Sequence, residues 1–230
     1  PLMMVDHHLL EYHLSEIAEA LNVMCDAMGA KEVLIGIKGK NMHLLDKDVV
    51  RSFRGTRIKI KEIPDVYPAG DEVMLTYETT GKIIPEGAIP IMVGVMVINV
   101  ETVFNIYKAL KNAEPVTEKY ITIGGDVPED ITVVAPMGMK IKDLLNSVGY
   151  GNLEGKSVVN GGPMMGIAQY NLKPPTVKTT SSILAFENID DIYSSETPCI
   201  RCGKCVGHCP MQLMPLNINR FALSKNYEMA

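Results

Sequence analysis

The chain lacks tryptophan, contains only 4 phenylalanines in 230 residues, and carries no excess of positive charge. Lysine and arginine together (22) are outnumbered by aspartate and glutamate (27), so the net charge is −5. This balance argues against a nucleic-acid-binding surface. No apolar run reaches the roughly 20 residues that span a bilayer, and the longest, 88–100, is predicted to be a buried strand. The hydrophobic content of 47% is that of a soluble globular protein with one to two domains and a further short segment.

Cysteine is also scarce, except in one place. Of the 5 cysteines, 4 lie within residues 199–209. Cys199, Cys202, Cys205 and Cys209 have the spacing C-x2-C-x2-C-x3-C and are followed by Pro210. This is the bacterial ferredoxin run for a [4Fe–4S] cluster, whose fourth cysteine ligates the other cluster in two-cluster ferredoxins.

Zinc and free thiols are the alternatives for this run. Structural zinc sites usually combine two separated pairs of ligands, and the chain has no second pair. Disulfides are typical of small secreted chains, and this chain of 230 residues has no second cysteine group with which the run could pair. The fifth cysteine, Cys25, lies on the apolar stripe of a helix predicted at 14–29 and is expected to be a core thiol. A reduced cytoplasm fits both the run and this unpaired thiol.

The first hundred residues alternate between strand and helix patterns. Strands are predicted at 32–38 and 57–63 with a short helix at 44–53 between them, which favours a βαβ unit with a parallel sheet. A third strand is predicted at 93–98. The histidines of this region have no metal-ligand spacing and are interpreted as surface or capping residues; they are His7, His8, His13 and His43.

Asn99 begins a predicted helix at 99–110 and admits two interpretations. Its side chain can cap the helix, and Glu101 in the first turn suits the helix dipole. Alternatively, this strand-to-helix junction points backbone N–H groups at an anionic or flavin ligand.

After residue 113 the pattern becomes strand, strand, helix, strand within about 60 residues, which suggests a small β-grasp-like module. The two strands of its first hairpin flank a Gly-Gly-Asp turn. The glycine loop at 160–166, "NGGPMMG", is either a binding surface or a plain turn. An extended connector with a strand follows at 171–186, and an acidic stretch, 187–196, leads to the cysteines.

Four segments together carry a family resemblance. They are "YPAGDE" (67–72), "VGVMVINVETVFNIYKAL" (93–110), "NGGPMMGIA" (160–168) and "PCIRCGKCVGHCPMQLMP" (198–215). In this order they resemble the C subunit of the Rnf electron-transport complex and its close relatives, over essentially the whole chain. Those relatives include cobalamin reductase and a carrier associated with proline reductase.

The resemblance implies an α/β fold class in three parts. Residues 1–113 would be part of a complex I flavoprotein-like flavin and NADH domain, and 114–170 a β-grasp domain of the soluble-ligand-binding (SLBB) type. Residues 171–194 would be a connector, and 195–230 an incomplete ferredoxin-type segment. The family's glycine-rich flavin loop and second cysteine run do not occur here, so the chain is expected to be an internal piece that binds FMN weakly or not at all.

The resemblance also implies site residues. The flavin contacts carried over are Tyr67, Gly70, Glu72 and Asn99, with Asp71 in place of a family glutamate. For Tyr67 and Gly70, a turn at a helix start explains the pattern equally well. Cys199, Cys202 and Cys205 would hold one [4Fe–4S] cluster and Cys209 the other. Arg201 and Lys204 beside them would either raise the cluster potential or serve solubility.

The function implied is electron transfer between NADH, a flavin and [4Fe–4S] clusters, with FMN and NADH bound in the full-length protein. This piece alone is expected to be inactive. The alternatives are a soluble carrier for a cobalamin or amino-acid reductase, a non-catalytic cluster relay, and a metal-free interaction module. The partners would be the other members of such a complex or a reductase, with ferredoxin or flavodoxin as further candidates. The location would be cytoplasmic, or peripheral on the membrane through partner proteins.

Overall fold

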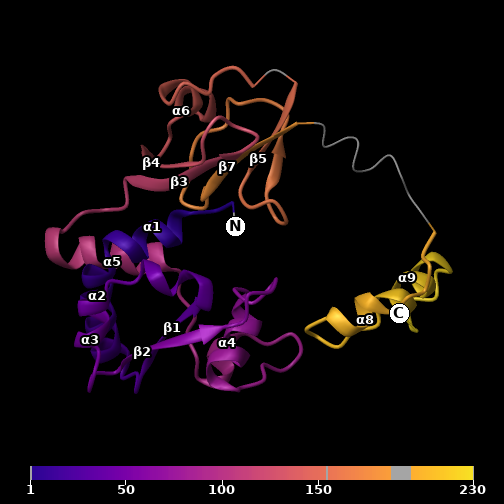
Figure 1. The fold of residues 1–230 in the computed structure, drawn as a ribbon, viewed down its shortest axis with the longest axis horizontal. Coiled ribbons are helices and arrows are strands. Elements are labelled where there is room, and N and C mark those ends of the chain that lie inside the picture. Colours follow the sequence, from indigo (N-terminus) through magenta and orange to yellow (C-terminus); the bar gives the residue numbers. More distant parts are fainter. Residues whose placement is uncertain (1, 154, 188–197, 230) are drawn as a thin grey trace. The chain divides into compact units, whose positions relative to one another are not determined.

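A computed structural model describes residues 2–153, 155–187 and 198–229. The chain divides into two compact units, Pro1–Ile189 and Asp190–Ala230. The first unit contains a helical part with a small parallel sheet and a second, larger sheet (Figure 1). No helix of the described residues is long and apolar enough to cross a membrane.

The helical part begins with α1 (Val5–Tyr12) and α2 (Leu14–Met28), which meet at His13. The helix predicted at 14–29 is confirmed as α2, which ends at Gly29 and buries Cys25 to 1% exposure. Strand β1 (Val33–Lys38) pairs in parallel with β2 (Ile58–Ile63). Between them lie the 3-10 helix η1 (Gly39–Leu44) and α3 (Lys47–Ser52). The predicted βαβ unit is therefore confirmed.

Helix α3 begins three residues later than predicted because Asp46 caps it. The Asp46 carboxylate accepts hydrogen bonds from the backbone N–H groups of Asp48 at 2.8 Å and Val49 at 2.9 Å. A side-chain acceptor at this position satisfies donors that the first helical turn leaves unpaired. Helix α4 (Glu72–Thr80) and helix α5 (Val100–Asn112) follow.

The strand predicted at 93–98 is wrong, and so is the buried strand at 88–100. Residues 90–93 form a 3-10 helix, η2 (Pro90–Val93), and 95–99 have no regular structure. Pro90 lacks the N–H that a ladder needs, and the turn closes when the Val95 N–H donates to the Pro90 carbonyl at 3.1 Å. Met92 and Met96 are exposed. An apolar run alone cannot distinguish a paired strand from an extended segment without a partner.

The second sheet has the strand order β4-β3-β7-β5-β6. Its elements are β3 (Glu118–Gly125), β4 (Ile131–Pro136), α6 (Ile141–Ser147), β5 (Lys156–Asn160), β6 (Ile167–Gln169) and β7 (Ser182–Glu187). Strand β7 runs parallel to β3 and antiparallel to β5. The strand expected within the connector is therefore the central strand of this sheet.

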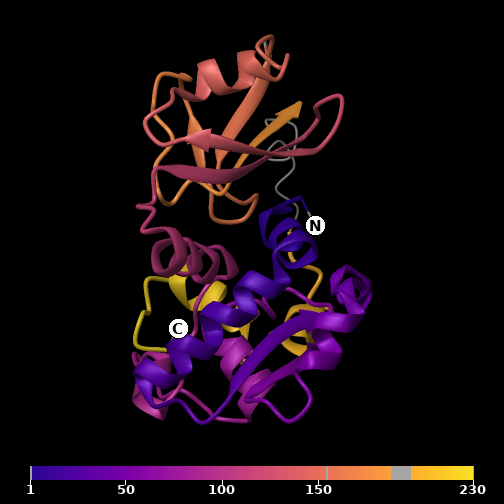
Figure 2. The same cartoon turned by 90° about the vertical axis from the view of Figure 1, so that its left-hand side faces the viewer.

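Each part of the first unit has its own apolar core. The helical core centres on Leu9 and Ile17 and reaches Phe104 of α5. The second core joins the sheet to α6, which lies against one face of it (Figure 2), through residues such as Ile121 and Leu145. The two parts are also tied by polar contacts. One of them runs from the Met4 N–H to the Thr122 hydroxyl at 2.9 Å.

The second unit contains the short helix α8 (Lys204–His208) and α9 (Pro215–Leu223). Most of the acidic stretch expected before the cysteines, from residue 188 on, lies outside the described residues.

Candidate functional site

The segment from Tyr67 to Glu72 forms the approach to helix α4. The Asp71 side chain caps the helix by accepting from the backbone N–H groups of Val73 at 3.0 Å and Met74 at 3.5 Å. Tyr67 is 68% exposed, and Gly70 and Glu72 are also exposed. The segment therefore forms a turn that leads into a capped helix, as one of its two interpretations predicted. The side chains of Tyr67 and Glu72 are exposed to solvent.

Asn99 caps helix α5, as its sequence position predicted. Its Oδ1 accepts from the Glu101 N–H at 2.9 Å. Its Nδ2 donates to both carboxylate oxygens of Asp6 on α1, at 3.2 and 3.4 Å. The carboxamide thus has a defined orientation, because one end is held by the helix and the other by a carboxylate of a different helix.

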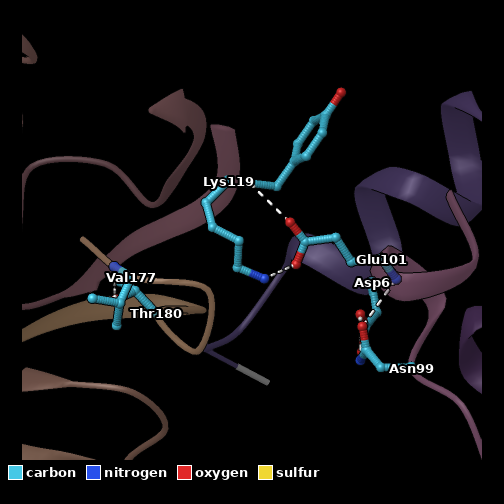
Figure 3. A network of polar contacts seen from close by, with 7 residues as sticks. Asp6, Asn99, Glu101, Lys119, Val177 and Thr180 are labelled. Atoms are coloured by element: carbon cyan, nitrogen blue, oxygen red, sulfur yellow. Dashed lines mark hydrogen bonds and ion pairs between the residues drawn. The ribbon is translucent and has the colours of Figure 1, made fainter. Parts of the chain in front are cut away.

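Glu101 has a structural role that the sequence pattern did not indicate. Its carboxylate is 4% exposed and faces strand β3, where it pairs with the Lys119 ammonium group and accepts from the Tyr120 N–H at 3.1 Å (Figure 3). The sequence favoured a role at the helix dipole. The partner lies 18 residues along the chain, which no local spacing rule would associate with Glu101.

A cavity of about 230 Å³ adjoins this network. Its lining includes polar residues of α1, α5, β3 and the loop before β7: Asp6, Asn99, Glu101, Lys119, Lys178 and Ser181. A second hollow of about 330 Å³ shares Glu101 and Lys119 and is lined further by apolar side chains such as Ile106 and Val116. The lining of both hollows includes none of residues 67–72. The structure therefore joins Asn99 to Asp6 and Glu101, and leaves Tyr67 and Glu72 at the start of α4.

The histidines near this network are packed rather than simply surface residues. The His8 ring lies 4.7 Å from that of Tyr12 and 5.7 Å from that of Tyr120, and the His13 ring lies 4.4 Å from that of Phe104. Burial lowers the pKa of His8, and the neighbouring His13 lowers it further. Burial also lowers the pKa of His7, whose Nε2 contacts Asn41 Nδ2 at 2.8 Å.

All four cysteines of the run belong to the second unit. Cys199, Cys202 and Cys205 are exposed, and Cys209 is partly buried. The Arg201 N–H lies 3.4 Å from the Cys199 sulfur and donates to it. Gly203 has φ of +74°, a conformation that residues with a Cβ rarely adopt, and it starts helix α8 between two of the cysteines.

These residues fit an iron–sulfur cluster chemically. Four accessible thiols form a soft donor set, and backbone N–H groups donating to sulfur are among the features that tune such clusters. Within the described ranges, no group of three or more histidine, cysteine, aspartate or glutamate side chains is gathered in the geometry of a metal site. The cysteines therefore remain predicted ligands.

Comparison with known proteins finds a domain match in the first part of the chain. Residues 1–108 match the family model of the Nuo51 FMN-binding domain. The fold is similar to a chain in the crystal structure of NAD+-reducing [NiFe]-hydrogenase in its H2-reduced state, with a TM-score of 0.65. The match covers 81% of this chain and 38% of that one, at 17% sequence identity, and it supports the fold alone.

Several relatives align with almost the whole chain. The chain is 31% identical to cobalamin reductase PduS of Citrobacter freundii, over 100% of its own length and 54% of the relative's. It is 30% identical to the C subunit of the Na(+)-translocating ferredoxin:NAD(+) oxidoreductase complex of Acetobacterium woodii, and this match covers 96% of the chain and 50% of the relative. It is 31% identical to the C subunit of the proton-translocating ferredoxin:NAD(+) oxidoreductase complex of Clostridium ljungdahlii, and this match covers 94% of the chain and 47% of the relative.

The resemblance to Rnf-type C subunits and cobalamin reductases is therefore confirmed, and the chain is related to both along almost its whole length. It spans about half the length of the curated relatives that it matches.

Proposed function

We propose that this chain is part of an electron-transfer subunit that passes electrons between NADH, a flavin and [4Fe–4S] clusters. The single observation that carries this proposal is the combination of two features in one chain. The FMN-binding domain match covers residues 1–108, and a ferredoxin-type cysteine run lies at 199–209. Bound flavin would exchange a hydride with NADH and release single electrons, while the protein positions it and tunes its potential.

The flavin contacts in this proposal come from two helix starts. Asn99 offers an oriented carboxamide at the start of α5, and Tyr67, Gly70 and Glu72 stand exposed at the start of α4. Helix N-termini favour anions such as a flavin phosphate, because their backbone N–H groups and dipole point outward.

The proposal also assigns roles to the cysteine run and to the second sheet. Cys199, Cys202 and Cys205 would hold one cluster and Cys209 would serve another. The β-grasp domain of the SLBB type, expected at 114–170, would extend to residue 187, because strand β7 of the connector belongs to the same sheet. Its support is the strand order β4-β3-β7-β5-β6, in which β3 and β7 are parallel neighbours although they are the first and last strands along the chain. Helix α6 packs on one face of this sheet.

The partners and location are proposed on the relatives' names. The C subunits of two ferredoxin:NAD(+) oxidoreductase complexes align with nearly the whole chain. We therefore propose the other members of such a complex as partners, and a peripheral place on a membrane through them. A second candidate is a soluble cobalamin reductase role, because PduS of Citrobacter freundii aligns with the whole chain at 31% identity.

Two measurements test the function. The chain is reconstituted anaerobically with iron and sulfide, and FMN is titrated by calorimetry into this chain and into a longer one that carries a glycine-rich loop. Asn99→Ala should weaken FMN binding about tenfold through loss of an oriented hydrogen bond. Asn112→Ala, at the other end of α5, is the matched control. Equal affinities for both variants, or no iron retained, would contradict the proposal.

A further inference from the structure

The contact between Glu101 and Lys119 differs from an ordinary surface ion pair. Glu101 is 4% and Lys119 9% exposed, so both charges have been removed from most of their water. Glu101 also uses its second oxygen, which accepts from the Tyr120 N–H at 3.1 Å. A buried carboxylate with both oxygens occupied has very little freedom to move, because any displacement leaves a charge unpaired.

This carboxylate belongs to the residue whose backbone holds Asn99. The Glu101 N–H donates to Asn99 Oδ1 at 2.9 Å, while Asn99 Nδ2 donates to Asp6. The result is a continuous chain of polar contacts from β3, through the first turn of α5, to α1. Figure 3 shows Glu101 directed toward Lys119 and Asn99 directed toward Asp6.

We propose that Glu101 and Lys119 are positioning residues, through which the five-stranded sheet sets the orientation of the Asn99 carboxamide. The role of that carboxamide as a flavin contact rests on the proposed function; the coupling itself rests on the contacts alone. Both members of the pair also line the cavity beside Asn99. The second sheet would then act on flavin binding without touching the flavin.

The same helix offers a matched control. Lys108, near the end of α5, also bridges to β3, with its Nζ 2.7 Å from Glu118 Oε1, and its pKa is raised by that hydrogen bond. Its side chain is 20% exposed, and it lies nine positions beyond Asn99. If ion pairs between α5 and β3 serve only to hold the helix in place, loss of either lysine should have the same effect on Asn99.

The test uses nuclear magnetic resonance of the Asn99 side-chain amide in this chain, and titration of FMN into the longer chain that carries a glycine-rich loop. In Lys119→Met, the Asn99 amide signals should shift and exchange faster with solvent, and the FMN dissociation constant should rise about five- to twentyfold. Lys108→Met should leave both unchanged. The double variant Glu101→Gln/Lys119→Met removes both charges, so it provides a folded comparison if Lys119→Met does not fold; it should also shift the Asn99 signals.

Two results would overturn the inference: unchanged Asn99 signals in every folded Glu101 or Lys119 variant, or equal changes in Lys119→Met and Lys108→Met. The proposed function fails differently. If the longer chain that carries the glycine-rich loop does not bind FMN at millimolar concentration, the flavin role fails, while the Asn99 signals of the present chain still decide whether the coupling exists.

Discussion

Lys119 of strand β3 pairs with Glu101 in the first turn of helix α5, and both side chains are almost completely buried. This contact joins the helical part of the first unit to its five-stranded sheet. Glu101 lies two residues after the cap residue Asn99, and its N–H donates to the Asn99 side chain. The ion pair therefore connects the five-stranded sheet to the candidate flavin site.

Removing one partner of this pair should destabilise the first unit. Lys119→Met leaves the Glu101 carboxylate buried and uncompensated, so we expect a loss of about 3–5 kcal/mol in the free energy of unfolding. The double variant Glu101→Gln/Lys119→Met should lose less, since no buried charge remains. Urea denaturation measures both. Arg51→Met breaks an exposed pair with Asp48 and should change stability by at most about 1 kcal/mol; a similarly small loss in Lys119→Met would contradict the prediction.

The stability of the helical part should fall on acidification because of His8. Its pKa in the folded protein is lowered by burial and by His13, so the unfolded chain binds the proton more readily. The stabilisation is therefore complete above the unfolded pKa of about 6.5 and is lost as the pH falls below it. His8→Phe keeps a ring between Tyr12 and Tyr120 and cannot titrate.

We accordingly expect the drop in urea midpoint between about pH 7.5 and pH 5.5 to be smaller in His8→Phe than in the unsubstituted chain. Part of the drop should remain, because burial also lowers the pKa of His7. Identical pH slopes in the two proteins would show that His8 does not contribute.

Gly125 should not tolerate a side chain. Its φ is +94°, and an added Cβ would lie 2.3 Å from the Ala185 carbonyl oxygen of the neighbouring central strand. We expect Gly125→Ala to lower the free energy of unfolding by about 1–3 kcal/mol. Gly70→Ala is the control, because no atom lies within 4 Å of its Cβ position, and its stability should stay within about 0.5 kcal/mol. Equal stabilities would exclude the close approach at Gly125.

The cysteine run should account for all iron bound by the chain. After anaerobic reconstitution, Cys199→Ser, Cys202→Ser and Cys205→Ser should each lose most of the visible cluster absorption, because each removes a proposed thiolate ligand. Cys25→Ser alters a thiol that is 1% exposed in the helical core and should keep the absorption. Retention of iron in all three run variants would rule out these ligands.

The first unit should fold without a cluster. Its two cores lie within residues 5–104 and 121–183, and the cysteine run lies in the other compact unit. A variant with all four run cysteines replaced by serine should therefore unfold cooperatively, at the same thermal midpoint as the unsubstituted chain without iron. Loss of cooperative unfolding would mean that the run also supports the first unit.

Several local features were predictable because neighbours along the chain decide them. The apolar spacing of residues 14–28 gives α2, and the Asn99 side chain caps α5. The β3–β4 hairpin was also predicted, although Gly124 and Gly125, expected in its turn, are the last residues of β3 and the connection is 126–130. The cysteine spacing likewise points to an iron–sulfur cluster without any structure. In each case the interacting groups lie within a few residues of one another, so sequence spacing alone places them together.

Features with distant partners were not predictable in this way. The apolar segment 93–98 has the composition of a strand, yet it forms no strand in the described structure. Strand β7 looks like part of a connector until β3 and β5 are seen on either side of it.

The sequence by itself determined helix α2, the Asn99 cap of helix α5, the βαβ unit, the cysteine run and the relationship to Rnf-type C subunits. Only the tertiary structure decided that Glu101 would be buried against Lys119, that Asn99 would be held by Asp6, and that residues 67–72 would stand apart from the cavity beside Asn99. The physical reason is that a buried charge or amide takes its partner from whichever element packs against it, and that element is chosen by the whole fold.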